Sequence, residues 1–111
     1  MKKTLYKKEL IEATAENSAM TLKYFLLESE IEIDSATLRC YGVEIKKTAL
    51  EGTKELSEVK QIKNTFFDKS EALCFLDMLA RNTVTPMSLS SVLEDYIQDA
   101  IHSRKRLPVL I

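Results

Sequence analysis

The apolar residues in the first half of the chain recur at every second position, which is the periodicity of β-strands. The clearest stretch covers residues 20–34, where apolar side chains occupy both parities at the centre before clean alternation returns at Ile31 and Ile33. A strand that is apolar on both faces at its centre is usually covered on both sides. The short polar spacer at residues 34–36 then predicts an antiparallel turn into a second strand.

Two other segments of this half carry mixed signals. The opening segment permits a strand or a helix, and we favour the strand. Beyond a loop around Gly52, the apolar residues Leu56, Val59 and Ile62 are spaced by three, which permits a helix or a bulged strand. The first half therefore predicts three to four strands, at about residues 4–14, 20–34, 37–47 and 56–63.

The second half changes to the period of 3.6 residues that is typical of amphipathic helices. Asp68 or Ser70 can cap a helix at about residues 69–81, and Asn82 can end it in a left-handed conformation. The buried stripe expected for this helix is Leu73, Leu76, Leu79 and Ala80.

A second helix is expected at about residues 86–103. Thr85 is placed to act as its N-cap, and Pro86 suits the first helical position. Its apolar stripe is the strongest structural signal in the chain and should be buried. The stripe consists of Leu89, Val92, Leu93, Tyr96, Ile97, Ala100 and Ile101.

Strands followed by helices predict an α+β fold, with an antiparallel sheet of three to four strands and two C-terminal helices packed on one face. The length of 111 residues is that of a single domain, here residues 1–111. Hydrophobic residues make up 45% and charged residues 30%, which indicates a globular protein rather than a disordered one.

The formal net charge of −1 lacks the basic surplus that is typical of a free-standing nucleic-acid binder. No apolar run resembles a signal peptide or a membrane span, so a cytoplasmic protein without membrane contact is expected. Cys40 and Cys74 lie in apolar runs without a CxxC motif, which favours two reduced and buried thiols.

Two short motifs resemble a known family. They are YGVEI at residues 41–45 and VTP at residues 84–86, the latter followed by Leu89, Val92 and an acidic pair at residues 94–95. Together they are similar to a family of small uncharacterised proteins, a domain of unknown function, from clostridia-like bacteria. The resemblance implies a bacterial cytosolic protein of this architecture and implies no mechanism.

Candidate chemistry is sparse. His102 is the one histidine, so a Cys–His nucleophile would arise only if the fold happened to bring the pair together. Asp95, Asp99 and His102 share one face of the last helix at the spacing of a cation site, but we favour a solvated polar face, which explains the same residues. No catalytic residue, metal ligand or cofactor is therefore assigned.

The C-terminus offers the candidate interaction residues. Arg104, Lys105 and Arg106 form a basic cluster, and Val109, Leu110 and Ile111 form an apolar tail that should seek burial on a sheet. The leading interpretation is a small non-enzymatic regulatory or protein-interaction domain, which binds a protein partner or a second copy of itself. The alternatives are a nucleic-acid-associated regulator that uses the basic cluster, and an enzyme or metal-binding protein, which has less support.

Overall fold

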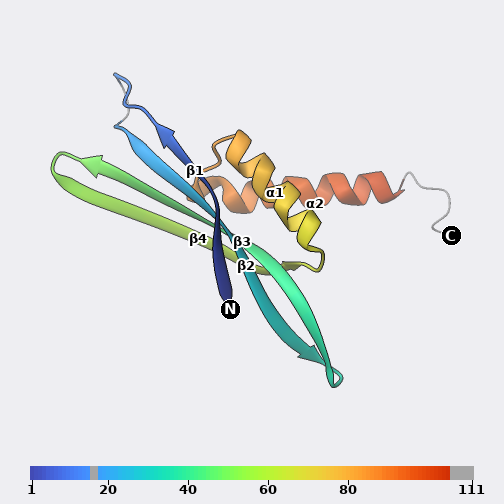
Figure 1. Cartoon of the computed structure of the whole chain (residues 1–111). Coiled ribbons are helices and arrows are strands. Elements are labelled where there is room, and N and C mark those ends of the chain that lie inside the picture. Colours follow the sequence, from blue (N-terminus) through green and yellow to red (C-terminus); the bar gives the residue numbers. More distant parts are fainter. Residues whose placement is uncertain (16–17, 106–111) are drawn as a thin grey trace.

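A computed structural model describes residues 1–15 and 18–105, with residues 102–105 described by their backbone alone. The four strands form one antiparallel sheet in the order β1-β2-β3-β4, and the helices follow, as expected for this α+β class (Figure 1). The elements are β1 (Lys2–Ile11), β2 (Met20–Ile33), β3 (Ala36–Glu51), β4 (Lys54–Phe66), α1 (Lys69–Arg81), the 3₁₀ turn η1 (Pro86–Ser88) and α2 (Leu89–Lys105).

The molecule is thin and elongated. It measures 57 × 34 × 17 Å, and its radius of gyration of 16.7 Å exceeds the value of about 13 Å expected for a compact chain of this length. The helices cover the middle of the sheet, while the long hairpins project past them on both sides (Figure 1). The smallest dimension leaves room for the sheet and a layer of helices on one side only.

Both β3 and β4 are longer than the sequence pattern predicts, because the hairpin turns are tight. Asp34 and Ser35 both adopt positive φ, 51° and 67°, which is the geometry of a two-residue turn that matches the twist of a hairpin. Ala36, expected in the spacer, therefore starts β3. The expected loop around Gly52 shrinks to a turn in which that glycine has a φ of 66°.

Gly42 allows β4 to fold closely over β3. Tyr41 pairs with Phe66 and Val43 pairs with Ile62, so three residues of β4 bulge opposite one glycine. A Cβ added to Gly42 would collide with the carbonyl oxygen of Ile62 and would lie 2.8 Å from the Cα of Lys63. This backbone contact requires a glycine, and a glycine inside a strand typically marks such a bulge or close approach.

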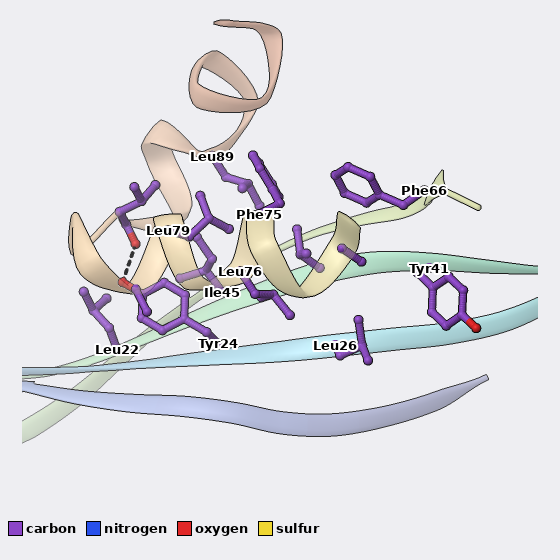
Figure 2. Close-up of a cluster of buried hydrophobic side chains, with 14 residues drawn as sticks. Leu22, Tyr24, Leu26, Tyr41, Ile45, Phe66, Phe75, Leu76, Leu79 and Leu89 are labelled. Atoms are coloured by element: carbon purple, nitrogen blue, oxygen red, sulfur yellow. Dashed lines mark hydrogen bonds between the residues drawn. The ribbon is translucent and has the colours of Figure 1, made fainter. Parts of the chain in front are cut away.

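The core lies between the sheet and α1. Tyr24, Leu26 and their neighbours on β2 and β3 meet Phe75 and Leu79 of α1, and all are almost fully buried (Figure 2). The hydroxyl of Tyr24 donates a 2.9 Å hydrogen bond to the carbonyl oxygen of Val84, which ties the turn after α1 to the sheet. Burial, with a smaller contribution from Glu9, raises the pKa of Tyr24 to about 12.

Helix α1 begins and packs largely as its pattern predicts, with two corrections. The carboxylate of Asp68 accepts a 3.3 Å hydrogen bond from the Ser70 amide, so Asp68 is the cap. Cys74 is exposed, and the prediction that it is buried was wrong, because the covered face is centred on Phe75 and Leu76. The left-handed residue after the helix is Thr83 rather than Asn82.

Helix α2 differs most from its sequence prediction. Thr85 makes no side-chain cap hydrogen bond, because a 3₁₀ turn precedes the α-helix, which begins at Leu89. Leu89 is fully buried, but Ile97 is 42% exposed and Ile101 is 40% exposed. The expected burial of the whole stripe is therefore wrong for its second half, because α2 extends past the covered part of the sheet (Figure 1).

Candidate protein-interaction surface

The sheet has one face that the helices cover and one face without helices. Buried residues such as Leu22, Tyr24 and Ile45 point toward the helices, and cross-strand partners share a face, so the residues between them point away. No helix among residues 1–15 and 18–105 packs on this second side, which we call the open face. Part of it is nevertheless covered, because the β4 bulge lies against Gly42 and the neighbouring Leu27 and Cys40 are buried.

Three lysines stand side by side on the open face. Lys8 of β1 pairs with Lys23 of β2, and Lys23 pairs with Lys46 of β3. In the part of the chain that the structure describes, none of them forms an ion pair. Like charges directly opposite one another destabilise a sheet. This lysine row is therefore an arrangement that the isolated fold does not favour.

Glu44 is the carboxylate nearest the row along β3, but it already interacts with two other side chains. Its side chain is buried, with 3% exposed, and the ammonium nitrogen of Lys3 lies 3.1 Å from its Oε2 atom. Gln61 donates a hydrogen bond to its other oxygen. Lys3 also lies 4.8 Å from the ring centroid of Phe25, the cross-strand neighbour of Glu44. The buried acid is thus neutralised by Lys3 and leaves the lysine row without a counter-charge.

Exposed apolar side chains flank the lysine row. Leu5 is 49% exposed, Val59 is 53% exposed and Leu10 is 72% exposed, and register places all three on the open face. Leu10 also lines an open depression of about 370 Å³ at the end of the sheet, together with Leu50. A surface of charge between apolar residues suits a partner that is itself acidic and partly apolar.

The second half of α2 forms another uncovered surface. Tyr96 anchors the helix through its ring, whose centroid lies 5.0 Å from that of Phe75 and 6.1 Å from that of Phe66. Burial, with smaller contributions led by Glu71, raises the pKa of Tyr96. The acidic residues Glu94 and Asp95, which precede Tyr96, and Asp99, which follows it, are all exposed.

The residues expected to form a site at the C-terminus are not brought together by described contacts. Arg104 and Lys105 belong to the last turn of α2, but their side chains and that of His102 lie outside the described part of the chain. Arg106, Val109, Leu110 and Ile111 lie outside it altogether. The predicted docking of the tail therefore stays a prediction.

The described surface offers little organised chemistry. A depression of about 630 Å³ is lined mainly by charged residues, of which Lys2 pairs with Glu28 and Arg39 with Glu30. Cys40 is buried. Within the described residues no group of three His, Cys, Asp or Glu side chains is placed to hold a metal ion. The described helices include none that is both long and apolar enough to span a membrane.

Comparison with known proteins places the chain in a family. The model of a family of unknown function, DUF6514, matches residues 1–99. The chain belongs to DUF6514. No curated protein and no solved structure matches it.

The region matched by DUF6514 includes the open face and most of the exposed side of α2. It spans the whole sheet with the lysine row, helix α1, and α2 as far as Asp99. The YGVEI motif lies within β3, and the VTP motif leads into η1. The basic cluster and the apolar tail follow the matched region. The parts of the chain that define the family thus include the open face and not the predicted C-terminal site.

Proposed function

We propose that the protein is a small non-enzymatic interaction domain whose open face binds an acidic helix of a protein partner. The observation that carries the proposal is the lysine row, because Lys8, Lys23 and Lys46 are adjacent and form no ion pair with the described residues. Repulsion within the row lowers the stability of the free domain. An acidic partner converts that cost into attraction, which raises both the affinity and the rate of association.

The geometry of the row fits a helix that crosses the strands. Neighbouring strands lie about 4.8 Å apart, so the row spans about 10 Å from Lys8 to Lys46. On an α-helix, seven residues span about 10.5 Å, and residues at i, i+4 and i+7 share a face. Three acids at that spacing can each meet one lysine, while apolar residues beside them contact Leu5 and Leu10.

The exposed apolar side chains favour a protein partner over a nucleic acid. Single-stranded nucleic acid is bound by basic grooves in which aromatic side chains stack with the bases. On the open face the aromatic residue nearest the row, Phe25, is covered by Lys3, and the exposed neighbours Leu10 and Val59 are aliphatic. Aliphatic side chains pack well against the apolar flank of an amphipathic helix.

The test is a binding titration with a fluorescent helical peptide that carries glutamates at i, i+4 and i+7 and leucines beside them. Each exposed ion pair contributes up to about 1 kcal/mol. Changing Lys8, Lys23 and Lys46 together to glutamine should therefore weaken binding by about tenfold to a hundredfold. Higher salt should weaken the binding of the unmutated protein.

The matched control changes Lys47, Lys54 and Lys60 to glutamine, which removes the same charge from positions outside the row. This variant should retain peptide binding, and a scrambled peptide of the same composition should bind neither protein tightly. Equal loss of binding in both triple variants would show a general charge effect and refute the assigned surface. Tighter binding of a single-stranded oligonucleotide than of the peptide would refute the protein partner.

A further inference from the structure

We infer that the helix which docks on the lysine row is α2 of a second copy of this chain. The inference rests on the proposed function, because it names the partner of the same row. It follows from two surfaces of one molecule that are both uncovered and carry opposite charge.

The exposed side of α2 combines acidic and apolar residues, the two kinds of side chain that suit the open face. Its acids lie at i, i+1 and i+5, and the pair Asp95 and Asp99 has the i, i+4 spacing of the striped peptide. Ile97 and Ile101 lie one turn apart on one side, and Asp95 and Asp99 lie one turn apart on another. Glu94 lies between these two pairs around the helix, at 100° per residue. The exposed surface of the helix therefore has the two isoleucines on one flank, Glu94 at its centre and the two aspartates on the other flank. The open face offers three lysines flanked by exposed Leu5 and Leu10.

The two surfaces cannot meet within one chain. Leu89 and Tyr96 hold α2 on the helix side of the sheet, against Phe66 and Phe75. The lysine row lies on the opposite side, because Lys23 is next to the inward-pointing residues Leu22 and Tyr24 on β2. Contact between them therefore needs another copy.

A pair of copies can satisfy both surfaces at once. Each chain offers one α2 and receives one, so a two-fold arrangement makes the same contact twice. Acids of α2 then face lysines of the row in each contact, which lowers the repulsion within the row. The exposed half of α2, which the chain's own sheet does not cover, is buried against the partner copy.

Charge reversal tests this contact by sedimentation velocity on the full chain over a range of concentrations. The unmutated protein should sediment as a dimer at high concentration and dissociate at high salt. One variant combines K8E, K23E and K46E, and the other combines E94K, D95K and D99K. Each alone sets like charges against each other and should sediment as a monomer. Mixed in equal amounts, they should form a dimer, because both contacts become complementary again.

Circular dichroism and urea midpoints check that each variant is folded. A control variant with K47E, K54E and K60E changes lysines outside the row and should still dimerise. Self-association of either reversed variant alone, or failure of the mixture to associate, would overturn the inference. An unmutated protein that stays monomeric while still binding the glutamate-striped peptide through the row would also overturn it, and would leave the proposed function standing. If the unmutated protein stays monomeric and also fails to bind the peptide, both the inference and the proposed function are refuted.

Discussion

Replacing Lys23 with glutamine should stabilise the isolated domain, because Lys23 faces a lysine on each side. Its cross-strand partners are Lys8 and Lys46, and the backbones of adjacent strands lie about 4.8 Å apart. If the ammonium groups spread to about 7 Å, Coulomb's law in water gives about 0.6 kcal/mol of repulsion per pair. Two pairs give about 1 kcal/mol, which agrees with the range measured for charged cross-strand pairs.

The measurement is urea unfolding at low salt, where screening is weak, and at a protein concentration low enough for sedimentation to show a monomer. The free energy of unfolding should rise by about 1 kcal/mol for Lys23→Gln, and the gain should shrink as salt is added. Lys47→Gln is the matched control, because Lys47 is half-buried like Lys23 but lies opposite Leu22 and Glu58. The Lys47→Gln substitution should leave the free energy of unfolding unchanged or lower it slightly.

A loss of stability for Lys23→Gln as large as that for Lys47→Gln would refute the reasoning. It would mean that the lysine side chains gain more from packing their stems on the sheet than they lose through repulsion. A gain that does not depend on salt would equally exclude charge repulsion as its cause.

Three other predictions follow from the core, the bulge and the thiols. The pKa of Tyr24 is raised to about 12, so between pH 10 and 12 the folded state keeps the phenol proton while the unfolded state loses it. The free energy of unfolding should therefore fall by about 1.4 kcal/mol per pH unit in this range. Tyr24→Phe should remove that fall and cost about 1–3 kcal/mol at neutral pH, as followed by urea midpoints, because a buried carbonyl loses its donor. Gly42→Ala should lower the free energy of unfolding by about 3 kcal/mol, since its methyl group would displace the backbone at Ile62, and an unchanged midpoint would contradict the close contact. A maleimide reagent should label Cys74 quickly and Cys40 slowly in the native protein, as resolved by peptide mass spectrometry, and equal rates would contradict the packing of α1.

The fold class could be predicted from the sequence because the hydrophobic pattern changes its period once, between the strands and the helices. The alternation around Ile31 and the 3.6-residue period of α1 each reflect one buried face. The exposure of Ile97 could not be predicted, because a helical stripe indicates which face is apolar and not how far the sheet beneath it extends. The prediction that Thr85 caps α2 was wrong for a local reason. A 3₁₀ turn precedes the α-helix, and no side-chain pattern in the sequence indicates it.

The lysine row was missed because it depends on register, which a single residue decides. With the two-residue turn at Asp34 and Ser35, Lys46 is the partner of Lys23, whereas the three-residue spacer that the sequence suggested would set Lys47 there. On the other side, the irregularity between Leu5 and Lys7 brings Lys8 opposite Lys23. Asp-Ser lacks the glycine that usually marks a two-residue turn, so the turn sequence did not reveal the first pair.

The strand order has a consequence for how the chain folds as it is synthesised. Each strand pairs only with its neighbour in sequence, so the contact order of the sheet is low and hairpins can form one after another from the N-terminus. The helices come last, which leaves Leu22, Tyr24 and Ile45 in water until α1 has been made. A chain that stops before residue 69 would therefore keep a bare apolar sheet with two open edges, and we expect such a nascent or truncated product to depend on chaperones or to aggregate.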